Sequence, residues 1–215
     1  AIARARTRGR GSDTIVRRLL QPGANDGQDL SDPIIRAILI GMITGFVPTN
    51  TMAAGHMLEM LLRRPDMMRA ARAAALADDD ELLKRVLWEA FRFLPLNPGP
   101  FRQCAVDAVV AAGTPREKTI KAGTKMLVGT HPAMFDPRRV DDPNRSDPSR
   151  AGRDNLTFGY GLHWCIGAPL AEAQIVGTLK PLLLRKNLRR APGKDGRLQK
   201  DGPFPAHLVV EYDVG

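Results

Sequence analysis

The spacing of apolar and polar positions predicts a mainly helical chain that carries small β-sheets. Ser31 to Pro33 is typical of a helix start, with Asp32 as the N-cap and Pro33 in the first turn. Apolar positions then recur from Ile34 to Leu62, until two arginines and Pro65 interrupt them. This stretch predicts one helix of about 30 residues, on the order of 45 Å long, which is long enough to cross a whole domain.

Shorter elements are predicted after this long helix. Residues 66–77 are rich in alanine and predict a second helix, while the acidic run from Asp78 to Glu81 predicts the start of a third, which ends before Pro95. Between 98 and 128, short apolar runs alternate with turns that contain Gly and Pro, as in β-hairpins. Residues 170–184 predict a last helix, and residues 208–212 predict a terminal strand. Because the chain shows neither repeats nor a low-complexity linker, we expect residues 1–215 to form one domain.

One cysteine stands in a setting that favours metal ligation. Cys165 lies in a loop, Phe158 to Gly167, with three glycines, and glycine permits the positive φ and close backbone approach that a tight loop needs. The helix predicted to start near Ala168 has free N–H groups and a dipole that favour a sulfur anion. Such a loop can curl under a flat macrocycle and present a thiolate to a heme iron, where it favours O–O bond cleavage. The alternative interpretation of Cys165 is a buried, unreactive thiol.

This loop resembles the heme-binding signature of the cytochrome P-450 family, Phe-Gly-x-Gly-x-His-x-Cys-x-Gly. All six fixed positions are matched, by Phe158, Gly159, Gly161, His163, Cys165 and Gly167. The resemblance covers the whole chain in the order of the family's second half, and the family's chains are considerably longer. It therefore implies the C-terminal, heme-binding half of a cytochrome P-450 fold, a heme-thiolate domain fragment without the usual N-terminal half.

The resemblance also implies roles for the loop residues. Cys165 would be the axial ligand of heme b. Phe158 would pack against the porphyrin or the thiolate loop, with ordinary core packing as the alternative, and Gly159 and Gly167 would shape the loop.

Outside the cysteine, the resemblance points to residues that hold the heme or the fold. His163 and, upstream, Arg102 would bind heme propionates; a surface histidine and a solvated arginine are the alternatives. Glu89 and Arg92 match the family's Glu-x-x-Arg signature. They would form a structural ion-pair network with an arginine just before the heme loop, for which Arg145 is the candidate.

The long helix departs from the family where protons are handled. The family usually has Ala/Gly-Gly-x-Asp/Glu-Thr there, and the acid and threonine help to deliver protons during oxygen activation. Counting back from Pro65 aligns this motif with Gly45 to Thr49, so Thr49 is retained and Pro48 replaces the acid. Pro48 removes a backbone donor and should kink the helix near residue 44. Two interpretations stay open: a kink that only sets the helix shape, or a catalytic site that suits a peroxide better than dioxygen with electrons.

The composition bears on partners and location. The net charge is +9, but the N-terminal arginines alternate with small residues and no aromatic residues interleave with them, so we expect no nucleic-acid binding. A basic surface could instead receive an acidic redox partner, such as a ferredoxin or flavodoxin. With only Cys104 and Cys165, a disulfide framework is not expected, and a reducing cytoplasm is the simpler location. The first ten residues lack an apolar signal segment, and the longest apolar run, Ala37 to Val47, is too short for a bilayer, so we expect a soluble protein without a membrane span.

The function expected from these features is that of a cytochrome P-450 monooxygenase, a heme-thiolate oxidoreductase that inserts oxygen into an apolar small molecule. The first alternative is a peroxide-dependent hydroxylase or hydroperoxide isomerase with the same heme site. The two are distinguished by whether a reductant or a peroxide drives turnover. The second alternative is a non-catalytic heme-binding sensor, which would keep Cys165 and show no turnover with either oxidant.

Overall fold

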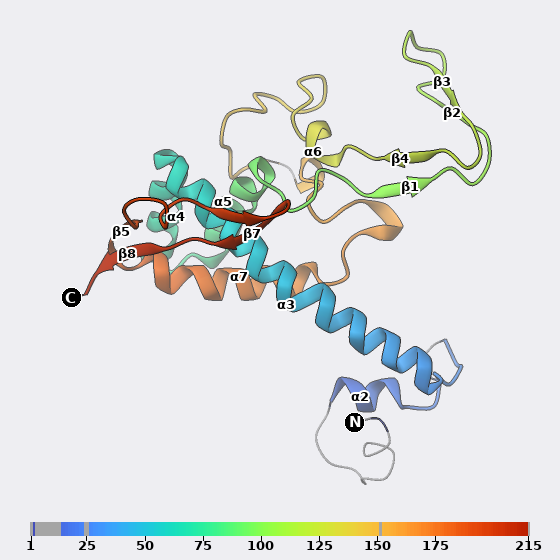
Figure 1. Cartoon of the computed structure of the whole chain (residues 1–215), viewed down its shortest axis with the longest axis horizontal. Coiled ribbons are helices and arrows are strands. Elements are labelled where there is room, and N and C mark those ends of the chain that lie inside the picture. Colours follow the sequence, from blue (N-terminus) through green and yellow to red (C-terminus); the bar gives the residue numbers. More distant parts are fainter. Residues whose placement is uncertain (1, 3–13, 24–25, 151, 215) are drawn as a thin grey trace. The chain divides into compact units, whose positions relative to one another are not determined.

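The computed structural model describes residues 2, 14–23, 26–150 and 152–214 (Figure 1). Its contacts divide the chain into two units, Ala1–Thr49 and Asn50–Gly215, which are described separately. The division falls inside one continuous helix, Asp32–Arg63, rather than at a linker. The organisation of the chain as one domain therefore stays a prediction.

The predicted helices and strands occur in the predicted order, together with further helices and strands that the sequence did not predict. The helices are α2 (Ile15–Leu19), α3 (Asp32–Arg63), α4 (Pro65–Leu76), α5 (Asp80–Phe93), α6 (Thr130–Ala133) and α7 (Ala168–Leu183). The strands are β1 (Phe101–Gln103), β2 (Ala108–Val110), β3 (Lys118–Ile120), β4 (Lys125–Leu127), β5 (Lys186–Arg190), β6 (Gln199–Asp201), β7 (Phe204–His207) and β8 (Val210–Asp213). The prediction of a mainly helical chain with small sheets is confirmed.

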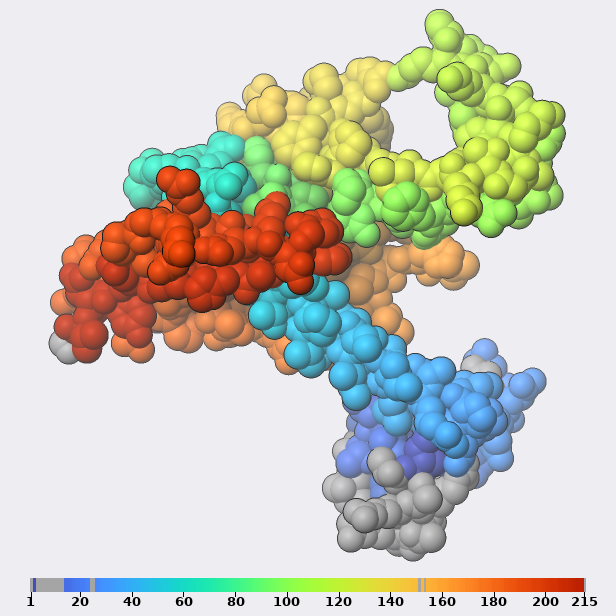
Figure 2. Space-filling model, viewed as in Figure 1, coloured from blue at the N-terminus to red at the C-terminus, as the bar shows by residue number. Residues whose placement is uncertain are grey.

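Each sheet has two antiparallel strands, paired β1 with β4, β2 with β3, β5 with β8 and β6 with β7. The β1–β4 pair brings Arg102 opposite Met126, and the β2–β3 hairpin continues beyond it. Figure 2 shows this hairpin standing away from the helical part of the same unit. Two of its apolar side chains, Val109 and Val110, are correspondingly exposed.

The first unit contains α2 and the N-terminal part of α3. The predicted start of α3 is corrected by one residue: Asp32 lies inside the helix, and the Ile35 N–H donates to the Ser31 carbonyl at 2.9 Å, so Ser31 takes the N-cap position. Apolar side chains on this part of α3 are exposed, among them Ile40, Ile43 and Val47.

α3 also corrects the prediction that the longest apolar stretch of the chain is too short to cross a bilayer. Among the described residues it is the one helix that is long and apolar enough to cross a bilayer, with a mean hydropathy of 1.4 over its most apolar 18-residue window. The uninterrupted run Ala37–Val47 was too narrow a measure, because uncharged residues extend the stretch beyond Val47 toward the C-terminus. A core helix of a soluble protein passes the same test, so the absence of a membrane span stays a prediction.

The second unit is built around one hydrophobic core. The C-terminal part of α3, α4, α5 and α7 pack together, as Figure 1 shows, with Leu61, Leu87 and Leu183 fully buried between them. Asp79 is the N-cap of α5, and its carboxylate accepts from the Leu82 N–H at 2.8 Å. This core fixes α5, which carries Glu89 and Arg92, against α7, which directly follows the glycine-rich loop of Cys165.

Candidate functional site

The loop from Phe158 to Gly167 folds back on itself to present one thiol. The Cys165 N–H donates to the Phe158 carbonyl at 2.8 Å, which closes the loop across seven residues. Gly159 has φ +82°, and a Cβ there would lie 3.2 Å from the His163 carbonyl oxygen. A side chain at position 159 would therefore be strained and crowded, which explains the glycine. Cys165 itself is exposed.

The surroundings of Cys165 fit a flat apolar macrocycle. α7 begins at Ala168, three residues after the thiol, and the Ala168 N–H donates to the Cys165 carbonyl at 3.1 Å. Leu162 and Ile166 flank the cysteine in sequence and are 97% and 98% exposed. An exposed soft thiol ligand among uncovered apolar side chains is the donor set that a heme iron with a thiolate ligand requires.

His163 and Arg102, the two residues predicted to bind heme propionates, lie on different elements of the second unit. His163 ends a short 3₁₀ turn, Gly161–His163, and is exposed. Arg102 lies in β1, where its guanidinium donates to the neighbouring Phe101 carbonyl at 2.8 Å. No carboxylate of the described residues pairs with Arg102. Both roles stay predictions.

Glu89 and Arg92 form a buried ion pair on α5. Their exposed fractions are 4% and 0%, and two hydrogen bonds of 2.8 and 2.9 Å join the guanidinium to the carboxylate. Arg92 also donates to the carbonyls of Met134 at 3.0 Å and Pro143 at 2.8 Å. A buried charge costs much free energy unless all its hydrogen bonds are made, and here α5 holds the segment 134–143 through those bonds.

The prediction that Arg145 completes this network is wrong, because Arg150 takes that place. The Arg150 side chain, 9% exposed, lies 3.5 Å from the Glu89 carboxylate, whereas the Arg145 side chain is 71% exposed and lies 3.9 Å from Asp147. Arg145 contributes only its carbonyl, which accepts from Arg150 at 3.2 Å. The backbone around residue 145 turns its carbonyl, not its side chain, toward the cluster.

In the first unit, α3 runs unbroken through Pro48. The Thr49 hydroxyl donates to the carbonyl of Gly45 and lies 3.3 Å from that of Phe46. Pro48 has no backbone N–H and cannot donate to the carbonyl of Thr44, four residues earlier. The Thr49 hydroxyl adds a hydrogen bond one residue further along the helix, to the Gly45 carbonyl. The kink and the catalytic roles of Thr49 and Pro48 stay predictions.

Sequence reasoning missed two residues that support the loop of Cys165. Trp88 packs its ring against Phe158, with 5.4 Å between the ring centroids. Asn155 donates to the Trp88 carbonyl at 3.2 Å, so it joins the segment before the loop to α5. The signal available in the sequence was the position of Trp88, directly before Glu89 of the Glu-x-x-Arg motif, on the apolar side of a predicted helix.

The chain is similar to known proteins. A model of the Cytochrome P450 family matches residues 4–210. Mycinamicin IV hydroxylase/epoxidase of Micromonospora griseorubida is 33% identical over 81% of this chain and 42% of that protein. A bifunctional dioxygenase–epoxy alcohol synthase of Pyricularia oryzae is 32% identical over 68% of this chain and 12% of that protein. The solved structure of substrate-free CYP109E1 of Bacillus megaterium matches 100% of this chain and 53% of its own, with a TM-score of 0.84 and 22% identity.

The chain thus spans less than half of the curated relatives named above and about half of the solved one. The solved structure shows the fold. The family model covers nearly the whole chain, including the loop of Cys165 and the helix of Glu89 and Arg92. From the match and the geometry together, the chain belongs to the cytochrome P450 family.

Proposed function

We propose that the protein is a P450 monooxygenase that inserts oxygen into an apolar small molecule, with Cys165 as the axial ligand of heme b. The observation that carries the proposal is the exposed thiol of Cys165 on a closed loop directly before α7, among uncovered apolar side chains. A heme held there would supply the oxidising chemistry, to which the thiolate contributes electron density. The name of the Micromonospora relative, a hydroxylase/epoxidase, supports the same reaction class.

The chain's own residues would hold and orient this group. Phe158, Gly159 and Gly167 keep the loop closed and leave room for the macrocycle, while His163 and Arg102 offer cationic or donating groups for its propionates. The buried cluster of Glu89, Arg92 and Arg150 holds the segment before the loop in place, which positions the thiol without touching the reacting atoms.

The proposal includes an electron donor and a location. The formal charge of +9 suits an acidic redox protein, such as a ferredoxin or flavodoxin, because opposite charges steer encounter. The two cysteines suit a reducing cytoplasm.

The test is an oxygen-labelling experiment with the full-length, heme-loaded protein. Mycinamicin IV is the first apolar probe, with a ferredoxin and its reductase as electron source and ¹⁸O₂ as oxidant. We expect one ¹⁸O atom per product molecule, and none with Cys165→Ala. Product that carries oxygen from water would overturn the monooxygenase reaction, and a panel of apolar compounds without turnover under either oxidant would favour the heme-binding sensor.

A second candidate function rests on Pro48. A peroxide arrives with its O–O bond already reduced and needs less proton delivery than dioxygen, so a proline in place of the acid favours peroxide-dependent hydroxylation or hydroperoxide isomerisation. The Thr49 hydroxyl is engaged with carbonyls of its own helix. The relative named as a dioxygenase–epoxy alcohol synthase supports this reading.

Two substitutions separate the acid from the kink. Pro48→Asp restores both a carboxylate and a backbone donor, whereas Pro48→Ala restores only the donor. If Pro48 limits proton delivery, product formed per reductant consumed rises in Pro48→Asp but not in Pro48→Ala, and cumene hydroperoxide drives the native protein. Efficient coupling in the native protein with no response to the peroxide would remove this candidate.

A further inference from the structure

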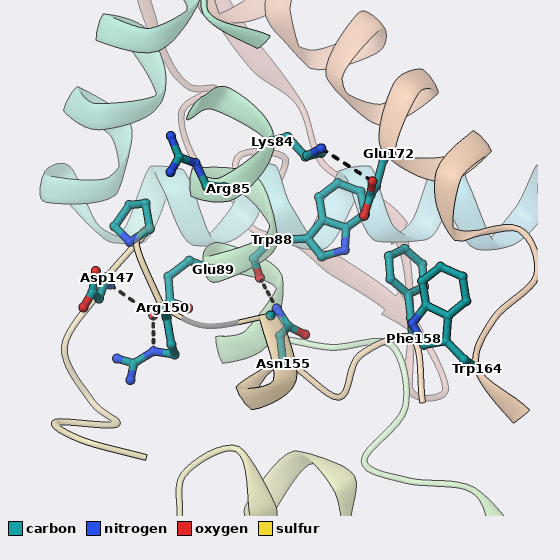
Figure 3. A pocket seen from close by; sticks show the side chains of 12 residues that line it. Lys84, Arg85, Trp88, Glu89, Asp147, Arg150, Asn155, Phe158, Trp164 and Glu172 are labelled. Carbon is teal, nitrogen blue, oxygen red and sulfur yellow. Dashed lines mark hydrogen bonds and ion pairs between the residues drawn. The ribbon is translucent and has the colours of Figure 1, made fainter. Parts of the chain in front are cut away.

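A cavity of about 270 Å³ lies beside the heme loop, within the second unit (Figure 3). It is bounded by α5, by residues 147–155 and by the first turns of α7. One water needs on the order of 10–15 Å³ of such space, and ligand pockets usually begin near 300 Å³. The cavity therefore suits a small organic molecule. Its lining includes the aromatic residues Trp88, Phe158 and Trp164.

Two donors in this lining, the Trp88 indole N–H and the Arg85 guanidinium, have no acceptor among the described residues. The indole N–H of Trp88 is buried, in a residue that is 9% exposed, and no described residue accepts a hydrogen bond from it. Arg85 lies one turn earlier on α5, so it shares a helix face with Trp88, and no described carboxylate pairs with it. By contrast, Lys84 lies 2.7 Å from Glu81 and 3.7 Å from Glu172. The lining also carries the carboxylates of Glu89, Asp147 and Glu172, and each of these pairs with another cation. What the Trp88 N–H and Arg85 lack is an acceptor oxygen that carries negative charge.

The remaining wall is aromatic. The ring centroids of Trp88 and Phe158 are 5.4 Å apart, and those of Phe158 and Trp164 are 6.2 Å apart. Figure 3 shows the rings of Trp88, Phe158 and Trp164 in succession along this wall. Trp164 is half exposed, so part of its ring is open to a partner. A planar apolar ring is the group that packs best against such a surface.

We propose that this cavity binds a small planar organic acid. Its carboxylate accepts from the Trp88 N–H and is attracted by Arg85, and its ring packs against Trp164. The occupant would touch the loop that holds the thiol, because Trp164 precedes Cys165 and the Cys165 N–H donates to the Phe158 carbonyl at 2.8 Å. The occupant would therefore act as an effector of the heme. This effector role rests on the proposed function, whereas binding of the acid to the cavity does not rest on it.

The two tryptophans of this sequence both line the cavity, so their indole N–H resonances report on it. Full-length ¹⁵N-labelled protein, as purified, is titrated with 2-naphthoate, and with naphthalene-2-carboxamide as the neutral analogue. We expect both indole resonances, assigned by substitution, to shift with 2-naphthoate, that of Trp88 downfield. Trp88→Phe keeps the ring and should weaken 2-naphthoate binding about tenfold.

Arg85→Gln should weaken 2-naphthoate two- to fivefold, as an exposed charge pair does, and leave the carboxamide unchanged. The matched control is Arg69→Gln, an exposed arginine of α4 outside the lining, which should leave both affinities unchanged. Binding would be overturned if neither indole resonance moves, if the carboxamide binds as tightly as the acid, or if Trp88→Phe and Arg85→Gln bind 2-naphthoate like the native protein. Resonances that move with an acidic protein and not with 2-naphthoate would overturn the small-molecule occupant.

The effector role is read separately in the heme-loaded protein. We expect the Soret band to shift along the titration with the same dissociation constant as the indole resonances. Binding without any such shift would overturn the effector role. Because the indole readout requires no iron ligation, failure of the proposed heme chemistry would leave the binding result standing, and the two failures are distinguishable.

Discussion

The two sequence motifs of the second unit stand in opposite surroundings. The Glu89–Arg92 pair on α5 is buried, and its charges are satisfied by a neighbouring arginine and by backbone carbonyls. The loop of Cys165 is open, with an exposed thiol and two side chains, Leu162 and Ile166, that are almost wholly exposed. The charges of the first motif are paired and hydrogen-bonded within the chain, whereas the thiol and the apolar side chains of the second motif are exposed.

This difference separates what positions the site from what performs its chemistry. A satisfied buried ion pair fixes the backbone segments that it joins, because leaving either charge alone would be costly. An exposed ligand in a rigid loop is ready for a group from outside. Substitutions in the buried cluster should therefore lower the free energy of unfolding, and should weaken heme binding only as a consequence. Substitutions in the open loop should weaken heme binding with little effect on the free energy of unfolding.

The largest effect on folding is expected from Arg92→Leu. The substitution leaves the buried Glu89 carboxylate with Arg150 and one backbone N–H, and frees the carbonyls of Met134 and Pro143. Loss of a buried partner costs on the order of 3–5 kcal/mol of unfolding free energy. Urea unfolding monitored by circular dichroism measures it. Arg69→Gln, in an exposed part of α4, serves as the control and should stay within about 0.5 kcal/mol of the native protein. An Arg92→Leu value as small as the control would break the contrast between the two motifs.

A middle-sized effect distinguishes the two arginines before the heme loop. Arg150→Gln removes a nearly buried guanidinium that contacts Glu89 and donates to the Asp141 carbonyl at 2.8 Å, so about 1–3 kcal/mol should be lost. Arg145→Gln changes an exposed side chain and should cost about 0.5 kcal/mol or less. The same unfolding assay compares them. Equal losses, or the reverse order, would restore Arg145 to the cluster.

The wrong prediction for Arg145 shows which features can be predicted from the sequence and which cannot. The periodicity of α5 and the glycines around Cys165 are local signals, so the helix, the loop and the exposed thiol could be predicted from neighbouring residues. Which arginine of the segment 140–150 points its side chain at Glu89 depends on backbone turns between elements, and no local pattern specifies it. The cavity wall at Trp88 likewise depends on how α5 packs against Phe158, across 70 positions of sequence.

The smallest effect concerns a titratable group outside both motifs. Burial first, and the charge of Lys200 second, lower the pKa of His56; the backbone of Leu94 and Pro95 and the charge of Glu59 oppose this without cancelling it. Between the folded and unfolded pKa values, His56 is therefore protonated in the unfolded chain and neutral in the folded chain. Stability should be complete above about pH 6.5, the ordinary value for histidine, and should fall as the pH drops through it toward the lower folded pKa.

His56→Leu should reduce this slope, measured as the urea midpoint between pH 7.5 and 5. Part of the slope should remain, because burial and the charge of Arg92 also lower the pKa of His131. A slope that His56→Leu leaves unchanged would show that His56 carries none of it.

The central claim is that Cys165 ligates a heme iron as a thiolate, and carbon monoxide spectroscopy tests it most directly. The full-length, heme-loaded protein is reduced under carbon monoxide, and the native form is compared with Cys165→Ala and with Cys104→Ala, which removes the buried cysteine. The strongly red-shifted Soret band of a thiolate-ligated iron should appear in the native protein and in Cys104→Ala, and should be lost in Cys165→Ala. An unshifted band in the heme-loaded native protein, or a shifted one that survives Cys165→Ala, would contradict the account.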